Sequence, residues 1–262
     1  MTIRWPAESI WETVVPLLPG FTVEILPQID SSNTELMRRA RAGQTEPTLL
    51  VAERQTAGRG RLGRDWQSDT QDGLATLTFS LGLPLQPADW SGLSLAVGLA
   101  VVQALHPRLQ LKWPNDVWLE GRKLAGILIE TTSVGDLRYA VIGIGINLLA
   151  RDSAGLRTPA AALQELLPQQ DAPTTLEALV LPLVRAVQAF ETQGFAGLRE
   201  AFHARDLLYG HEVLCTDGTQ GMARGVDASG ALLVHTASGL QKISSAEVSV
   251  RPVPSTVLPT DT

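Results

Sequence analysis

The residues best suited to chemistry in this sequence are concentrated in one stretch of nine, 58–66, which reads Gly-Arg-Gly-Arg-Leu-Gly-Arg-Asp-Trp. Glycine has no Cβ, so a loop rich in glycine can follow the outline of a ligand closely. Arginine adds a permanent charge on a planar group that matches a phosphate or a carboxylate. The stretch therefore predicts a loop that wraps an anion, and it follows an apolar run, 49–52, as ligand loops follow strands. A solvated basic turn is the alternative interpretation.

Three further segments carry polar side chains that could act on a ligand. Residues 112–116, Lys-Trp-Pro-Asn-Asp, interrupt a strand-like run, and turn formation is the commoner role of such an Asn-Asp pair. Lys123 begins another apolar run, where a lysine either faces a pocket or protects a sheet edge. Residues 31–33, Ser-Ser-Asn, precede a predicted helix, so they either line a site or only cap that helix.

The hydrophobic pattern predicts the elements that position these residues. Strand-like runs cover residues 21–26, 49–53, 74–83, 111–117, 117–119, 123–130 and 137–148. Helical periodicity covers residues 9–15, 90–105, 160–167, 175–192 and 195–206. A further helix is expected to begin at Ser32 and end at Gly43. The capping-box spacing makes Ser32 its N-cap, with the Glu35 side chain reaching back.

These elements predict an α+β protein with four segments. Residues 1–20 form an N-terminal extension that prolines interrupt, 21–208 form the main domain, and 209–253 form a small β domain of short strands between turns. Residues 254–262 are rich in proline and threonine, which predicts a disordered tail. Residues 143–147, Gly-Ile-Gly-Ile-Asn, do not complete the Gly-x-Gly-x-x-Gly pattern, which argues against a Rossmann dinucleotide site.

Composition and charge restrict the class of partner. The chain has 262 residues and a net charge of −6, so no overall positive field attracts nucleic acid or an anionic membrane. Seven arginines between positions 38 and 64 make a local positive region, which favours a small anionic ligand. Cys215 is the single cysteine and cannot form an internal disulfide, and no apolar run reaches the roughly 18 residues of a membrane span. We therefore expect a cytoplasmic protein without membrane contact.

Five segments together resemble the biotin–protein ligase family, and they follow the order of the motifs in that family. The segments are 30–33, 55–66, 112–116, 123–128 and 143–147. The resemblance covers about residues 21–205, and the β-rich segment after it is similar to the family's SH3-like domain. It implies that the main domain is a catalytic domain of the class II synthetase type, with a mixed or antiparallel sheet and helices.

The resemblance implies a reaction in two steps. Biotin attacks the α-phosphate of ATP to give biotinyl-5′-AMP and pyrophosphate, and a lysine of a biotin carboxyl carrier protein then takes the biotinyl group. The carrier would belong to acetyl-CoA carboxylase or a related carboxylase. Mg²⁺ would be held by the triphosphate rather than by a metal site of the protein. A homodimer is compatible with the family, whereas DNA and membranes are not expected partners.

Individual roles also follow from the resemblance. The loop at 58–66 would fold over biotin and the adenylate, mobile when empty and ordered when filled. The implied catalytic residues are Lys123, Arg59, Arg61 and Asp116. The implied biotin-binding residues are Ser31, Ser32, Asn33, Gln55, Gly58, Arg59, Gly60, Arg61, Lys123 and Gly126. The implied nucleotide-binding residues are Arg61, Arg64, Trp66, Lys112, Asn115, Lys123 and Asn147.

Other functions stay open from the sequence alone. A lipoate–protein ligase has a similar catalytic fold and also forms an acyl adenylate. An octanoyltransferase needs a nucleophilic cysteine, but Cys215 lies away from every motif, which favours a buried structural thiol. A DNA- or nucleotide-binding regulator would use the basic loop for salt-dependent binding. The first 20 residues are too short and too interrupted for a helix-turn-helix, so we expect no direct DNA role.

Overall fold

The computed structural model describes residues 3–68, 74–150, 158–244 and 250–252. In this part of the chain, seven strands form a mixed sheet in the order β1-β2-β3-β7-β6-β5-β4. β1 and β2 pair in parallel, and the other neighbours pair antiparallel. The bounds are β1 (Thr22–Leu26), β2 (Thr48–Ala52), β3 (Thr76–Pro84), β4 (Gln110–Lys112), β5 (Asp116–Leu119), β6 (Arg122–Val134) and β7 (Leu137–Asn147).

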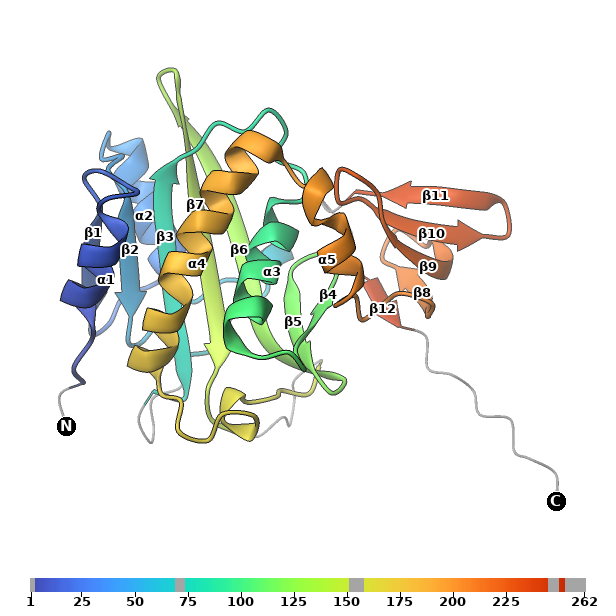
Figure 1. Cartoon of the computed structure of the whole chain (residues 1–262), viewed down its shortest axis with the longest axis horizontal. Helices are drawn as coiled ribbons and strands as arrows, with labels where there is room; N and C mark the ends of the chain where they lie inside the picture. Colours follow the sequence, from blue (N-terminus) through green and yellow to red (C-terminus); the bar gives the residue numbers. More distant parts are fainter. Residues whose placement is uncertain (1–2, 69–73, 151–157, 245–249, 253–262) are drawn as a thin grey trace.

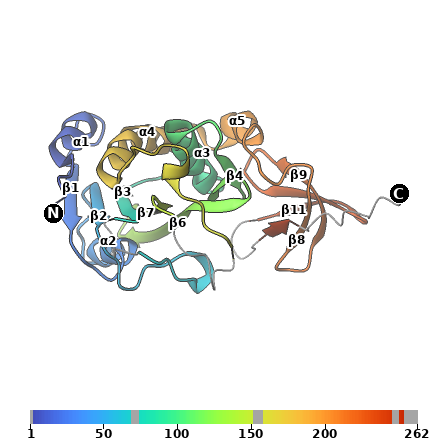
Figure 2. The same ribbon diagram turned by 90° about the horizontal axis from the view of Figure 1, so that it is seen from below.

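Helices cover both faces of this sheet, which confirms the expected α+β class (Figures 1 and 2). α2 lies on one face, while α1, α3 and α4 lie on the other. The helix bounds are α1 (Ala7–Val14), α2 (Ser32–Arg41), α3 (Leu93–Leu105), α4 (Ala172–Gln193) and α5 (Arg199–His203). Three short 3-10 turns are η1 (Arg61–Gly63), η2 (Leu163–Glu165) and η3 (Ala196–Leu198).

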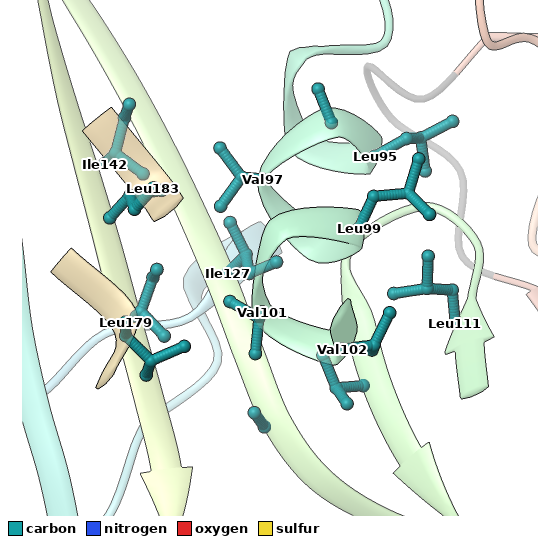
Figure 3. Close-up of a cluster of buried hydrophobic side chains, with 14 of the residues drawn as sticks. Leu95, Val97, Leu99, Val101, Val102, Leu111, Ile127, Ile142, Leu179 and Leu183 are labelled. Atoms are coloured by element: carbon teal, nitrogen blue, oxygen red, sulfur yellow. The ribbon is translucent and has the colours of Figure 1, made fainter. Parts of the chain in front are cut away.

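The main core lies between the sheet and the layer of α3 and α4 (Figure 3). Leu99 of α3, Ile127 and Ile142 of the sheet, and Leu179 and Leu183 of α4 are almost fully buried there. Each such side chain contributes about 1.5–3 kcal/mol by leaving water. Because side chains alternate along a strand, burying the isoleucines of β6 and β7 on this face turns their intervening residues toward α2. The packing of the core thus fixes which residues face the α2 side.

A second sheet contains five antiparallel strands in the order β11-β10-β9-β8-β12. Their bounds are β8 (Glu212–Cys215), β9 (Gln220–Val226), β10 (Leu232–Thr236), β11 (Gly239–Ile243) and β12 (Val250–Pro252). The short strands expected after residue 209 are therefore present. Trp113 Nε1 donates a 3.0 Å hydrogen bond to the Gly230 carbonyl and so links the two sheets. The predicted tail, 254–262, lies outside the described residues.

The segment before the sheet contains one helix. Ile10 and Val14 of α1 are buried, and α1 packs against α4 and β1. A helix-turn-helix needs two helices, so residues 3–20 do not form one. No helix in the described ranges combines the length and the apolar character needed to cross a bilayer.

Two local expectations were wrong. The N-cap of α2 is Ser31, one residue earlier than predicted: its backbone is extended and its hydroxyl accepts from the Thr34 amide at 3.4 Å. Glu35 does not reach back, because it pairs with Arg38 and Arg39. The helix expected over 160–167 is only the single turn η2, because the chain just before it is extended and pairs with the Lys123 backbone.

Candidate active site

One side of the site is a wall of neutral polar groups at the start of α2. The amide and the hydroxyl of Ser32 both donate to Gln55 Oε1, at 2.8 and 3.1 Å. Ser80 of β3 lies beneath them, with its Oγ 2.7 Å from Ser32 Oγ. Since Gln55 Oε1 is already occupied, the amide NH₂ group of Gln55 is the group left to donate elsewhere. The wall is preorganised by its own hydrogen bonds.

Both polar groups of the Asn33 side-chain amide form hydrogen bonds within this wall. Its Nδ2 donates to the Leu128 carbonyl at 3.2 Å and to Glu130 Oε2 at 3.0 Å, and its Oδ1 accepts from Ser80 at 2.6 Å. Only 3% of the residue is exposed. Gly143 makes this position possible, since a Cβ there would lie 2.1 Å from Asn33 Oδ1. Asn33 therefore shapes the site through its neighbours, with its amide groups already satisfied.

The loop at 58–66 is closed by its own backbone. The Gly60 amide donates to the Arg64 carbonyl at 2.7 Å, and the Trp66 amide donates to the Gly58 carbonyl at 2.9 Å. A Cβ on Gly58 would lie 2.4 Å from the Trp66 carbonyl oxygen, so this close approach requires glycine. Leu62 at the turn has a φ of +58°. The glycines thus shape the loop that carries Arg59, Arg61 and Arg64.

The indole of Trp66 covers a gap in the side chains of the sheet. Gly126 and Gly145 are register partners on β6 and β7. A Cβ on Gly145 would lie 2.3 Å from the Trp66 ring, and one on Gly126 would lie 3.5 Å from it. Lys123 Nζ is 6.0 Å from the ring centroid. The two glycines therefore admit the ring, and the ring brings the loop against the sheet.

Opposed charges lie at the β5–β6 end of the site. Lys123 Nζ is 2.8 Å from Asp116 Oδ1, in an ion pair that is mostly buried. Arg61 donates to Asn115 Oδ1 at 3.4 Å, and Asn115 Nδ2 donates to the Ile127 carbonyl at 2.8 Å. Burial lowers the pKa of the Arg61 guanidinium, and the nearby Asp116 carboxylate opposes that effect. This end of the site thus holds concentrated positive charge beside the Asp116 carboxylate.

These groups line a cavity of about 710 Å³, measured to its open mouth. Among the predicted site residues, those that line it are Ser31, Ser32, Asn33, Gln55, Arg59, Gly60, Arg61, Arg64, Trp66, Asn115, Asp116, Lys123 and Gly126. Three others lie beside it. Gly58 shapes the loop, and the Asn147 Nδ2 donates to the Lys123 carbonyl at 3.2 Å. Asn147 Oδ1 is buried without a hydrogen-bond partner among the described residues.

Lys112 is the third residue beside the cavity. Its Nζ lies 5.3 Å from the Trp118 ring centroid, and the residue is almost fully buried. Burial lowers the pKa of the Lys112 ammonium, Asp116 opposes this, and the positive charges of Lys123, Arg64 and Arg251 add to the lowering. Lys112 is thus a desolvated cation behind the ion pair of Lys123 and Asp116.

The sequence reasoning missed several contributors. The further lining residues are Asp65, Thr78, Phe79, Ile127, Leu128, Gly143, Ile144 and Gly145. Ser80 and Glu130 support the wall from just outside. One signal was available: Thr76, Thr78 and Ser80 alternate with apolar residues in a strand, which marks one polar face. Within the described residues, no group of three or more His, Cys, Asp or Glu side chains could hold a metal ion.

Comparison with known proteins places this geometry in a family. Residues 25–147 match the Biotin/lipoate A/B protein ligase family, and residues 212–251 match the Biotin protein ligase C terminal domain. The biotin--[acetyl-CoA-carboxylase] ligase of Paracoccus denitrificans is 36% identical over 240 residues, 86% of this chain and 98% of the relative. The bifunctional ligase/repressor BirA of Escherichia coli is 35% identical over 245 residues, 89% of this chain and 75% of the relative.

A solved structure shows the same fold. The biotin protein ligase of Aquifex aeolicus in complex with biotin and ATP is similar with a TM-score of 0.75 and 28% identity. The match covers 88% of this chain and 99% of that protein.

Proposed function

The chain belongs to the biotin protein ligase family, and from this premise we propose the reaction of the cavity and the role of each residue in it. The enzyme activates biotin as biotinyl-5′-AMP, with release of pyrophosphate from ATP, and transfers the biotinyl group to a lysine of a carrier protein. The observation that carries this is a single cavity with a neutral hydrogen-bonding wall on one side and a cluster of cations on the other.

The neutral wall suits the uncharged ureido ring of biotin. That ring has one carbonyl acceptor and two N–H donors, so it needs both kinds of partner. We assign Ser31, Ser32 and Gln55 to these contacts. The Gln55 NH₂ group supplies a donor because Ser32 holds its oxygen. Asn33 shapes the wall rather than contacting biotin, since its amide is already satisfied.

The cationic side suits adenylation. The biotin carboxylate must approach a triphosphate, so two anions are brought together while charge builds up on the α-phosphate. Lys123 lies in the cavity with an ion-pair partner that fixes its position, and Arg61 and Arg64 line the same space. In this assignment Lys123 stabilises the transition state, Arg61 and Arg64 hold phosphates, and Trp66 with Asn147 lies on the nucleotide side. Asn115 also lies on the nucleotide side, and the buried Lys112 supports this cluster from beside the cavity.

Transfer requires a neutral amine. A free lysine has a pKa near 10.4, so most carrier lysines are protonated at neutral pH. Asp116 lines the cavity and its carboxylate is held by Lys123 at 2.8 Å. We assign it the role of orienting the incoming ammonium and accepting its proton. Magnesium would be held by the triphosphate of ATP, where it would neutralise part of the phosphate charge, rather than by a metal site of the protein.

A thiol mechanism finds no support. Cys215 lies in β8 of the second sheet and is buried, and burial raises the pKa of its thiol to about 11 with a contribution from Asp217. A nucleophilic cysteine needs the opposite shift, because the thiolate is the reactive form. Acyl transfer through an enzyme thiol is therefore disfavoured.

Pyrophosphate release tests the proposal. Purified protein is mixed with ATP, Mg²⁺ and either biotin or lipoate, and pyrophosphate is followed over time. We expect release with biotin and, when a biotin carboxyl carrier domain is added, labelling of its lysine. Pyrophosphate release with lipoate and ATP, but not with biotin and ATP, would instead assign the site to the lipoate branch of the family.

The cellular setting is part of the same proposal. We propose a carrier domain of acetyl-CoA carboxylase or a related carboxylase as acceptor, in the cytoplasm, with no DNA ligand and with two copies able to pair. A gel shift at low and physiological salt tests DNA binding. Sedimentation with and without biotin and ATP tests pairing.

A further inference from the structure

Glu130 of β6 joins the loop at 58–66 to the wall built on α2. Both Glu130 carboxylate oxygens accept from Arg59 Nη2, at 3.0 and 2.9 Å. Oε2 also accepts from Asn33 Nδ2 at 3.0 Å. The Arg59 side chain is 45% exposed and that of Glu130 is 25% exposed, so the pair lies at the rim of the cavity. One carboxylate therefore contacts both opposing sides of the site.

This contact lies far from the reacting groups. Lys123 and Glu130 are seven residues apart on the same strand, which is about 23 Å at 3.3 Å per residue. Arg61, by contrast, lies close enough to Asp116 for that carboxylate to influence its pKa. Arg59 and Arg61 thus serve different ends of the cavity.

The wall side of the contact is rigid. Asn33 is held by Leu128, Glu130 and Ser80, and Ser80 Oγ also lies 2.7 Å from Ser32 Oγ. Glu130 therefore has a fixed position set by buried partners. Arg59 comes from a loop that also contacts the sheet through Trp66, on Gly145 and Gly126, and contacts Asn115 through Arg61. A fixed carboxylate is able to hold a loop that closes over a ligand.

We propose that Glu130 is a positioning residue that holds Arg59 and thereby keeps the loop at 58–66 closed over the bound adenylate. Arg59 then acts as the closing contact of the loop and does not bind phosphate. This inference rests on the proposed biotin adenylation. Under this proposal Glu130 determines how long the adenylate stays on the enzyme, whereas other residues form the adenylate.

The half-life of the adenylate on the protein is the measurement that tests this role. Wild-type protein is loaded with biotin and MgATP, passed through a desalting column, and sampled for the adenylate still bound. Glu130→Gln removes the charge that attracts Arg59, and we expect the half-life to fall about two- to fivefold, the size of one partly exposed ion pair. The rate of the first pyrophosphate release should change less than about twofold, because Lys123 and Arg61 are untouched.

A second variant separates this role from a folding defect. Arg59→Gln leaves the bond between Asn33 and Glu130 in place, so it should shorten the half-life by a similar factor without disturbing the wall. The double variant should be no worse than the more affected single variant, since both remove one interaction. Glu24→Gln is the matched control, because Arg39 Nη1 contacts both Glu24 oxygens at 2.8 Å outside the cavity.

The outcomes are distinct. No biotin-dependent pyrophosphate release by the wild type would refute the proposed function itself. Normal wild-type release with a Glu130→Gln half-life equal to that of Glu24→Gln would overturn the role of Glu130 alone. Multiplied effects in the double variant would also overturn it.

Discussion

The two sides of the cavity are built by opposite means. On the α2 side, Ser32, Asn33 and Ser80 are neutral, at most 3% exposed and tied to one another by hydrogen bonds. On the β5–β6 side, Lys123 and Arg61 are charged and only partly buried. Buried neutral groups that satisfy one another stabilise a fold, whereas desolvated charges oppose it unless they are paired.

The difference teaches how one pocket can serve recognition and reaction. The neutral wall binds a ligand group that stays unchanged through the reaction. The hydrogen bonds within the wall can therefore be rigid and fully formed before the ligand binds. The charged side meets groups whose charge changes, so it needs cations that are held in position before the reaction begins. The charged side is therefore expected to determine rate, and the neutral side to determine stability and biotin affinity.

Removing Lys123 should have the largest effect. Lys123→Ala is expected to slow pyrophosphate release about 100-fold or more, the loss typical of one preorganised charge. Biotin affinity should change far less, because the wall is intact. Single-turnover pyrophosphate release and biotin titration measure the two quantities. Near-normal release would break the assignment of rate to the charged side.

Removing the hydroxyl of Ser80 should produce the converse result. Ser80→Ala leaves Asn33 Oδ1 without its hydroxyl donor, while Ser32 Oγ keeps its bond to Gln55. This is expected to lower the free energy of unfolding by about 1–3 kcal/mol and weaken biotin binding. The adenylation rate at saturating biotin should stay within about threefold of wild type. Urea unfolding gives the first quantity, with Ser9→Ala, whose hydroxyl bonds an exposed Glu177, as control. A rate loss as large as that of Lys123→Ala would contradict the division between the two sides.

Sequence reasoning located the charged side better than the neutral one. Lys123, Asp116 and the loop arginines stand in short local motifs, so their chemistry is readable within a few residues. Ser80 and Glu130 are 47 and 97 residues from Asn33, and only the sheet register brings them to it. The alternation in β3 marks a polar face, but no local pattern says what lies opposite it.

The elements of the fold were likewise predictable where the pattern is local and missed where a distant contact decides. Hydrophobic periodicity located every strand of the large sheet within a few residues, because each has its own apolar pattern. The start of α2 was misplaced by one residue, since two adjacent serines are equally able to cap. The helix expected over 160–167 failed because its first residues pair with the backbone of Lys123, a contact that periodicity does not encode.

Arg61→Gly tests whether the charged side also retains the intermediate. Removing this cation is expected to raise the rate of adenylate release about tenfold, and released adenylate should modify lysines of bystander proteins. The measurement is adenylate half-life together with biotin labelling of added serum albumin. An unchanged half-life would show that Arg61 acts only during formation of the adenylate.

Lys112→Met should have the smallest effect of these variants, and it should stabilise the fold rather than destabilise it. Lys112 is almost fully buried against Trp118, and burial lowers the pKa of its ammonium, so the folded state disfavours its charge. Methionine keeps the packing and removes the charge, so the free energy of unfolding at pH 7 should rise by about 1 kcal/mol. The KM for ATP should rise as well if this charge supports the phosphates.

The pH dependence gives this last prediction its sign. A lysine whose folded pKa lies below its unfolded value of about 10.5 destabilises the fold fully at low pH, where both states are charged. As pH rises from the folded pKa toward the unfolded one, the native lysine is neutral and the destabilisation disappears. The advantage of Lys112→Met over wild type in urea unfolding should therefore shrink between pH 7 and about pH 10. Lys242→Met, which removes an exposed lysine paired with Asp227, should give no advantage at either pH. If the advantage of Lys112→Met is absent at pH 7, or does not change with pH, then the buried charge of Lys112 does not destabilise the fold.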